Sequence, residues 1–539
     1  MQFNHKKWLW VLALVAAISF DQLFWKKSGG INFFLFCLAA VLGGLIPIWL
    51  EKLSIPWSSY LLLAPATFFA AMTAFHSEPF TTTMNVLLTL ATLLIFAMTL
   101  RDGAWYGYTL WNHLASGFQF FLTSFTGGVQ FFQKIKAAPE AMDMPKPKSA
   151  DPKPVPSWRS YLRGVLLALP VVIVLAALLA SADPVFNNRL AHLFNWFNAD
   201  NLGEYIFRLF YVFIIGYFLL STYYFGLMKS GATRKDANGK PRVTPFLGMI
   251  EADIVLGAVI VLFLAFVILQ FTYLFGGTQN ITVEGFTYAE YARRGFFELL
   301  AVVVISLALF YALSVTTKRE TAAQRRVFSG LGLILLALIG IILVSAYTRL
   351  TLYETAYGFT RLRTLTHIFM VWVGLLLLAL AVMDLAQHIE KMALGLIVFA
   401  IGFGVTINLV NVDRLIVREN VTRAVTLPSE EMETMLDTGY LYSLSDDATP
   451  QLVTFYNDPT LPESIRDSLG GVLACRLAAL QDPNELPWQG FHFSRAKSAD
   501  LLQSQAGALS AYPVKEDQGW QQVEIHGEWI PCGYSNAMD

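Results

Sequence analysis

The chain has 539 residues, of which 55% are hydrophobic and only 14% carry a charge, with a formal net charge of −1. A soluble domain carries about 25% charged residues, so much of this chain is expected to face lipid. The near-neutral net charge gives no electrostatic basis for binding nucleic acid. Three cysteines exclude a disulfide-rich scaffold and a zinc site of the CxxC type.

Apolar segments of membrane-spanning length recur through the front three quarters of the chain. A bilayer core of about 30 Å needs roughly 20 apolar residues per helix. On this measure about eleven spans are predicted, centred on 8–25, 31–50, 56–75, 79–100, 162–182, 205–228, 250–275, 296–316, 327–348, 366–386 and 392–410. The predicted fold is therefore all-α: a polytopic membrane protein with a small C-terminal helical domain outside the membrane.

The first span follows Lys6 and Lys7, and no small-residue cleavage site comes after it, which predicts an uncleaved helix rather than a signal peptide. Lys and Arg gather in three later connections, within 134–159, 229–242 and 318–326. With about eleven spans these connections share a side with the N-terminus, and the positive-inside rule makes that side cytoplasmic. The C-terminal domain is then extracytoplasmic, and an error of one span reverses this placement.

Two segments between the spans have a different composition. Residues 104–133 are aromatic but interrupted by Gly117, Gly127 and Gly128, which favours a pair of interfacial helices. Residues 137–157 are rich in Pro, Lys and Asp, which is typical of disorder. The chain thus divides into a front membrane block with four spans, a disordered cytoplasmic linker, a rear block with seven spans and a tail: 1–133, 134–161, 162–410 and 411–539.

The tail replaces long apolar runs with amphipathic spacing. Apolar residues recur there at three- and four-residue steps, as in a packed helix, at Leu469, Val472, Leu473, Leu477 and Leu480. After about residue 484 the periodicity fades, so we expect a mostly helical domain with an irregular end. Cys475 and Cys532 both lie in the tail, and a disulfide between them would fit an external location, although their spacing does not demand one.

Charge and tyrosine concentrate in two stretches on the predicted external side. The first is YAEYARRGFFE at 288–298, in which a helix would stack Glu290, Arg294 and Glu298 at four-residue spacing. The second is YTRLTLYETAYGFTRLR at 347–363. Charge is expensive in a chain built for lipid, so both stretches mark candidate sites.

Within the second stretch, Arg349, Tyr353 and Tyr357 share one face if the preceding span continues as a helix past the membrane surface. Gly358 is a suitable terminator of that helix, because glycine tolerates a left-handed conformation.

The next helix would be capped by Thr360, which places Arg361 and Arg363 in its first turns. Arginine is unfavourable there for the helix dipole. That mismatch predicts acidic partners, and Glu298 and Glu354 are the nearest by topology.

Four stretches follow one another along the rear half of the chain: YARRGFFELL, YTRLTLYETAYGFTRLR, NLVNVDRLIVRENVTRA and LDTGYLYSLSDDATPQL. They resemble successive signatures of an uncharacterised family of bacterial multi-pass membrane proteins, described as a domain of unknown function. The resemblance covers about residues 250–455 and leaves the front block and the end of the tail outside. It implies a bacterial membrane protein with this external cluster, and it supplies no catalytic residue.

Three interpretations of the charged cluster are open. Interfacial arginines and paired charges can lock helix ends together. Arginine forks also suit an anionic headgroup, a lipid-linked sugar or a small anion. A proton or ion pathway is the third. The common nucleotide-binding, hydrolase and metalloprotease motifs do not occur, and we predict no catalytic residue, no metal ligand and no cofactor.

We therefore expect a non-enzymatic protein of the cell envelope, placed in the bacterial cytoplasmic (inner) membrane. Its expected partners are the lipid bilayer, an anionic lipid or lipid-linked ligand, and an envelope protein, with no nucleic acid. The predicted ligand-binding residues are Arg294, Glu298, Arg349, Tyr353, Glu354, Tyr357, Arg361 and Arg363. A secondary transporter is the main alternative, followed by an intramembrane transferase and a signalling or assembly scaffold.

Overall fold

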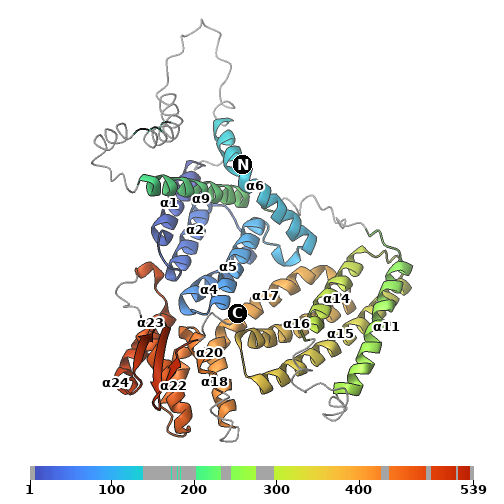
Figure 1. The fold of residues 1–539 in the computed structure, drawn as a ribbon. Coiled ribbons are helices and arrows are strands. Elements are labelled where there is room, and N and C mark those ends of the chain that lie inside the picture. The colour runs from blue at the N-terminus through green and yellow to red at the C-terminus, as the bar shows by residue number, and fades with distance from the viewer. Residues whose placement is uncertain are drawn as a thin grey trace.

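The computed structural model describes residues 6–137, 202–231, 245–274, 296–426, 436–480, 487–517 and 520–533, together with residues 172, 179 and 183. The predicted all-α polytopic class is confirmed (Figure 1). Nine helices within these ranges are long and apolar enough to cross a bilayer, and Trp8–Phe24 is a shorter apolar helix. The protein is therefore a multi-pass integral membrane protein. The predicted span at 162–182 and most of the predicted linker lie outside the described residues.

One group of membrane helices packs around a shared apolar core. It consists of α1 (Lys6–Phe24), α2 (Ile31–Leu50), α4 (Leu63–Phe75), α5 (Pro79–Thr99), α6 (Leu110–Ala137) and α9 (Leu202–Met228). The short helices α3 (Trp57–Tyr60) and η1 (Trp105–Gly107) connect its members. Although α9 follows the linker in sequence, it packs against α1 and α6, so this front group in space includes a helix from the predicted rear block.

The rear group surrounds a second core that contains Phe310, Leu335 and Ile339, all fully buried. Its helices are α11 (Met249–Leu274), α14 (Phe296–Thr316), α15 (Ala322–Tyr357), α16 (Arg361–Leu385) and, after η4 (Ile389–Lys391), α17 (Met392–Val410). Helix α17 also contacts α4 and α5, where Asn85 and Asn408 exchange two amide hydrogen bonds of 2.9 and 2.7 Å. This buried pair satisfies both amides and ties the two groups together inside the membrane.

Helix α15 extends beyond the predicted span at both ends. It begins with a capping box in which Thr321 and Gln324 bond reciprocally, and it ends at Gly358, whose φ of 79° matches the predicted terminator. Its 36 residues give a length of about 54 Å, well over a hydrocarbon core of about 30 Å. The helix is therefore longer than the hydrocarbon core is thick.

The predicted break into two helices is wrong, because α6 is one continuous helix, and its interfacial position stays a prediction. Two of its glycines serve close packing against α9 instead of ending a helix. A Cβ on Gly128 would meet the Tyr217 ring at 2.3 Å, and one on Gly127 would meet Ser221 at 3.1 Å. Small residues at such positions let two membrane helices approach closely.

The tail is mostly helical, as predicted. Its helices are α18 (Val412–Val425), α20 (Thr438–Ser443), η5 (Asp446–Ala448), α21 (Thr449–Tyr456), α22 (Glu463–Ala478), η7 (Trp488–Gly490), α23 (Phe493–Ser504) and α24 (Ala506–Leu509). The expected irregular end was wrong. It forms a three-stranded antiparallel sheet of β1 (Val514–Asp517), β2 (Trp520–Ile525) and β3 (Glu528–Pro531).

A disulfide joins Cys475 of α22 to Cys532 just after β3. On the same helix three residues of the predicted apolar stripe, Leu469, Val472 and Leu473, are buried. Leu477 is partly buried, and Leu480 lies beyond the end of the helix. Val523 of β2 packs into the same core. The sheet and the helices thus form one unit held by a shared core and a covalent bond.

The tail contacts three loops that lie at one end of the membrane helices. Ile31 N, at the start of α2, donates to Phe491 O at 3.0 Å. Ser77 N, between α4 and α5, donates to Asp447 Oδ2 at 3.1 Å. Arg361 N, at the start of α16, is 2.8 Å from the Tyr440 hydroxyl. The tail therefore covers loops from both helix groups.

Candidate functional site

Arg361 lies where α16 meets the tail, and its guanidinium pairs with carboxylates that the sequence did not predict. Its Nε and Nη2 donate to the two oxygens of Asp413 at 2.7 and 2.6 Å. Glu78 lies 3.7 Å from Nε. Asp413 is fully buried and also accepts the Ser445 N–H at 2.7 Å. The expected pairing of Arg361 with Glu298 or Glu354 was wrong, and the observed fork ties α16, α18 and the start of α5 together.

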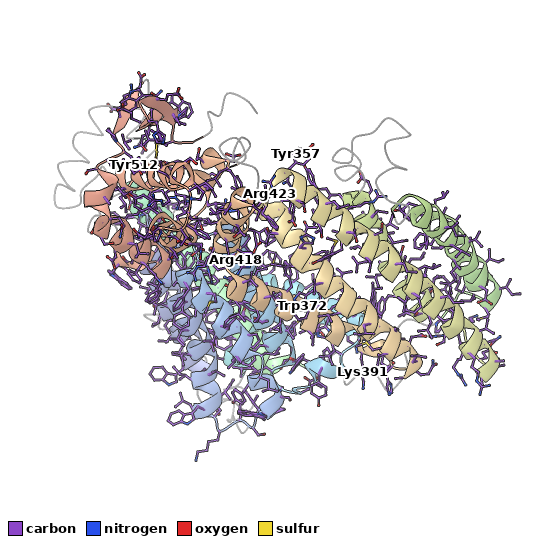
Figure 2. The ribbon with its side chains drawn as sticks, turned by 90° about the horizontal axis from the view of Figure 1, so that it is seen from below. Tyr357, Trp372, Lys391, Arg418, Arg423 and Tyr512 are labelled. Atoms are coloured by element: carbon purple, nitrogen blue, oxygen red, sulfur yellow. A yellow bond between two sulfur atoms is a disulfide. The ribbon has the colours of Figure 1, made fainter. Side chains whose placement is uncertain are left out.

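Arg363 packs on the turn between α15 and α16. It donates to Gly358 O at 2.5 Å, and its guanidinium lies 3.9 Å from the centre of the Tyr353 ring. The Tyr353 and Tyr357 rings are 5.1 Å apart, edge to face. Figure 2 shows Tyr357 at the exposed end of α15, near Arg423 of α18. These residues stabilise the turn through a cation–π contact and an aromatic pair.

The other predicted residues lie in separate places. Arg349 is buried between α15 and α11, where its Nη2 donates to Gln270 Oε1 at 3.0 Å. Glu354 is buried and its Oε2 lies 2.9 Å from His367 Nδ1. Glu298 is exposed near the start of α14, and Arg294 lies outside the described residues. The structure thus divides the predicted cluster into several local groups.

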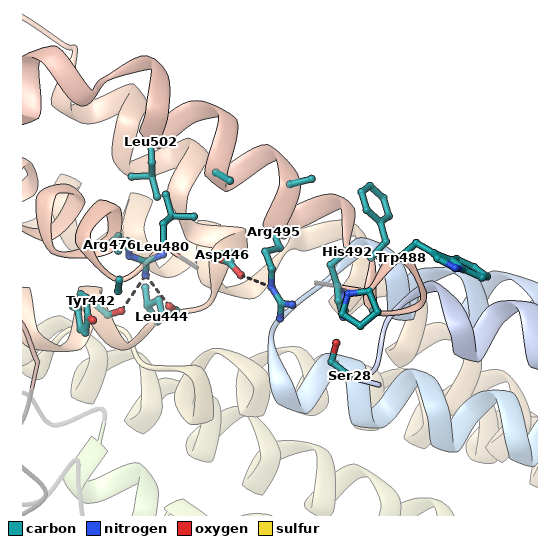
Figure 3. Close-up of a pocket in the computed structure, with 16 residues that line it drawn as sticks. Ser28, Tyr442, Leu444, Asp446, Arg476, Leu480, Trp488, His492, Arg495 and Leu502 are labelled. Carbon is teal, nitrogen blue, oxygen red and sulfur yellow. Dashed lines mark hydrogen bonds and ion pairs between the residues drawn. The ribbon is translucent and has the colours of Figure 1, made fainter. Parts of the chain in front are cut away.

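A pocket of about 670 Å³ lies where the tail meets the loop between α1 and α2 (Figure 3). We call it the junction pocket. The polar side chains that line it are Ser28, Tyr442, Asp446, Arg476, Trp488, His492 and Arg495. Its other walls are apolar and include Leu480, Phe491 and Leu502. Membrane block and tail therefore both contribute to it.

Two buried side chains of this pocket have polar atoms without hydrogen-bond partners among the described residues. His492 Nε2 is 2.8 Å from Gly29 O, so this nitrogen carries a proton and donates it, whereas Nδ1 has no partner. The terminal nitrogens of Arg476 donate to four backbone carbonyls and to Thr449 Oγ1, whereas its Nε has no partner. Buried polar atoms are nearly always paired, so two such atoms on residues that line one pocket mark it as a candidate site.

The charge state of His492 decides whether its Nδ1 donates or accepts a hydrogen bond. Burial lowers the pKa of its imidazole, and the Gly29 carbonyl offsets this only in part. In the neutral ring, with the proton on Nε2, Nδ1 is a hydrogen-bond acceptor. A ligand hydroxyl is its natural partner.

Arg495 supplies a more mobile positive charge at the same pocket. Its Nε is 3.8 Å from Asp446 Oδ2, and both side chains are partly exposed. Trp488 is 61% exposed and presents a large aromatic surface beside it. The pocket thus combines an acceptor for a hydroxyl, donors for an anion and an apolar wall.

Sequence reasoning did not identify these residues. His492 and Arg495 lie in the stretch where periodicity fades, and Ser28 reaches them from the other end of the chain. The one signal available was the local group of Trp488, His492 and Arg495, since exposed aromatics beside cations are frequent in binding sites.

One comparison places the chain in a family. A family model described as "Domain of unknown function (DUF4153)" matches residues 63–455. The chain belongs to the DUF4153 family. The match begins well before residue 250, so the expectation that the whole front block lies outside the family was wrong.

The DUF4153 region contains Arg361 and Asp413, whereas Ser28 and His492 of the junction pocket lie outside it. No curated protein and no solved structure matches the chain. The DUF4153 assignment therefore supports a multi-pass membrane protein and gives no information on its activity.

Proposed function

We propose that this protein binds an anionic, hydroxyl-bearing amphiphile in the junction pocket, on the external side of a bacterial cytoplasmic membrane. The ligand would be the headgroup of an anionic phospholipid or of a lipid-linked sugar. The observation that carries this proposal is that two buried atoms on residues lining one pocket, His492 Nδ1 and Arg476 Nε, have no hydrogen-bond partner in the described part of the chain. A phosphorylated polyol complements both, because its hydroxyl donates and its phosphate accepts.

Arg495 would complete the anion site. Its contact with Asp446 is long and partly exposed, and exposed ion pairs contribute only about 0–1 kcal/mol. A phosphate can therefore replace Asp446 as its partner at little cost. The apolar wall, including Leu480 and Phe491, would cover the start of the acyl or glycerol part of the ligand.

Two observations support an external position for the tail. Basic residues gather in loops at the opposite end of the membrane helices, as Lys391 illustrates in Figure 2, and positive loops favour the cytoplasm. They are Lys52, Arg101, Lys229, Lys318, Arg319, Arg325, Arg326 and Lys391. The disulfide between Cys475 and Cys532 is a feature of oxidising compartments such as the periplasm.

The predicted arginine cluster has a structural role in this proposal. A ligand at Arg361 would have to displace Asp413, which is fully buried and would be left as an unpaired charge. The ligand class predicted from the sequence is kept, and the junction pocket takes the place of Arg361.

The test is lipid binding measured by native mass spectrometry on the full-length protein. We expect dioleoyl phosphatidylglycerol to bind at least about tenfold more tightly than dioleoyl phosphatidylcholine, because one charged hydrogen bond is worth about 1.5–3 kcal/mol. The double variant Arg495→Ala/His492→Ala should lose this preference. Free glycerol phosphate tests whether the headgroup alone suffices.

The matched control is Arg418→Ala. Arg418 is exposed on α18 (Figure 2), pairs only with its neighbour Glu419 among the described residues, and does not line the pocket. Equal binding of the two lipids by the wild type, or an unchanged preference in the double variant, would refute the proposal.

A further inference from the structure

Three side chains near the tail-facing end of α15 and α16 form a relay that is separate from the junction pocket. Glu354 Oε2 is 2.9 Å from His367 Nδ1. His367 Nε2 is 3.3 Å from Thr351 Oγ1. A hydroxyl, an imidazole and a carboxylate in this order are the arrangement that activates a nucleophile. We propose that Thr351, His367 and Glu354 form a catalytic triad for acyl transfer from a lipid ester.

The protonation pattern required for this chemistry follows from the contacts. Glu354 is only 2% exposed, and its carboxylate accepts the proton on His367 Nδ1, which leaves Nε2 as the base. The Thr351 hydroxyl has one proton and two acceptors, His367 Nε2 at 3.3 Å and Tyr347 O at 3.1 Å. When the Thr351 hydroxyl rotates from the Tyr347 carbonyl to the imidazole of His367, it is activated as the nucleophile.

The position of the three residues fits a lipid ester. Thr351 and His367 each lie about 9 Å along their helices from the turn that joins α15 to α16. The interfacial layer on each side of a bilayer is about 5–7 Å thick. With the turn at the outer surface of that layer, Thr351 and His367 lie near the boundary between headgroups and hydrocarbon. Thr351 is exposed on the helix surface and open to a substrate from the membrane.

The reaction balances with a lipid ester as acyl donor and an alcohol or water as acceptor. Thr351 Oγ attacks the ester carbonyl while His367 Nε2 takes the hydroxyl proton. The C–O bond to the lipid alcohol then breaks, and His367 returns the proton to that alcohol. The acceptor next attacks the acyl-threonine, gives its proton to His367, and the proton returns to Thr351 as the second ester bond breaks.

Two neighbours support this chemistry. Glu354 acts as a positioning residue that holds the imidazole and stabilises the imidazolium formed in each step. Tyr347 is one turn before Thr351 on the same face, and its ring centroid is 4.5 Å from that of His367.

The experiment uses full-length protein in nanodiscs of phospholipid with labelled oleoyl chains. Acyl-protein is measured by mass spectrometry of the Thr351 peptide, and released oleate is counted. We expect acyl-Thr351 or oleate release in the wild type and in Thr351→Ser. Thr351→Val should abolish both, and His367→Gln should lower the rate about a hundredfold, as expected for a lost general base.

Thr348→Val is the matched control, because Thr348 bonds to the carbonyl of Val344 on its own helix. It should leave the rate unchanged. Thermal unfolding of each variant separates loss of chemistry from loss of fold, and the exposed Thr351 position tolerates an isosteric valine. Absence of both acyl-protein and oleate release in the wild type overturns the proposal, as does unchanged activity in Thr351→Val.

Discussion

The turn between α15 and α16 and the junction pocket are both rich in charged and aromatic residues, but they differ in how their basic side chains are paired. At the turn, Arg361 binds Asp413 and Glu78, and Arg363 binds a carbonyl and a tyrosine ring. In the pocket, His492 and Arg476 each keep one buried nitrogen that no described residue bonds to.

This difference shows what a dense run of charges in a membrane protein signifies. A charge near lipid needs a partner, and the first partner available is another part of the same chain. Sites for outside molecules are recognised by what remains unsatisfied after the chain has paired its own groups. The two regions therefore should respond to mutation in opposite ways.

The largest effect is expected for Arg361→Ala. This change leaves Asp413 buried without its cationic partner, which costs about 3–5 kcal/mol when a buried pair is broken from one side. Unfolding in detergent, followed by heat or denaturant, measures the loss. The lipid preference at the junction pocket should persist in the fraction that remains folded.

Arg495→Ala is the paired variant for that comparison. Its ion pair with Asp446 is partly exposed, so stability should change by no more than about 1 kcal/mol while lipid binding falls. If both variants lose stability and binding to the same degree, Arg361 and Arg495 do not have the different roles, structural and ligand-binding, that we assign to them.

A somewhat smaller effect is expected for removal of the disulfide with Cys475→Ser/Cys532→Ser. The bond closes a sequence separation of 57 residues, and losing such a crosslink typically costs about 2–4 kcal/mol. Because Cys475 precedes Arg476, the wall of the junction pocket should loosen, and limited proteolysis should cut the tail faster.

Wild-type protein treated with reductant is the control for the cysteine variant, and it should behave in the same way. The pairing of Arg361 with Asp413 does not depend on β3, so the membrane helices should keep their stability. Tail proteolysis that is unaffected by both reductant and substitution would show that the core alone holds the tail.

The membrane architecture could be predicted from the sequence, because span length and apolar composition are local properties. The predicted spans coincide with described helices except at 162–182, which lies outside the described residues. Gly127 and Gly128 misled the prediction, since a glycine that breaks a helix and one that lets α9 approach look alike in sequence. The C-terminal strands were missed because only short segments alternate.

The site could be predicted much less well, because its partners are remote in sequence. Arg361 was correctly expected to need an acid, but Glu78 and Asp413 are reached only through the packing of α5 and α18 on α16. The relay of Thr351, His367 and Glu354 spans two antiparallel helices and has no single period. Charge can be counted along a chain, whereas satisfaction of polar atoms depends on the fold.

The smallest expected effect is a pH dependence of tail docking through His492. Burial lowers its pKa below the ordinary value of about 6.5, Gly29 O offsets this in part, Arg495 lowers it further, and Asp446 and Asp447 raise it. The unfolded chain therefore takes up a proton before the folded one does. Stability is full above about pH 6.5 and is lost progressively as the pH falls below that value.

Hydrogen exchange of the amides at 490–493, compared at pH 7.5 and pH 5 after correction for intrinsic rates, measures this loss. His492→Gln should flatten the dependence, whereas His526→Gln, at an exposed histidine on the turn between β2 and β3, should preserve it. A ligand whose hydroxyl donates to Nδ1 should steepen the dependence, because that bond favours the neutral ring and lowers its pKa further. If saturating glycerol phosphate leaves the acid-induced opening unchanged, His492 does not contact the ligand. The anion site would then consist of Arg476 and Arg495 alone.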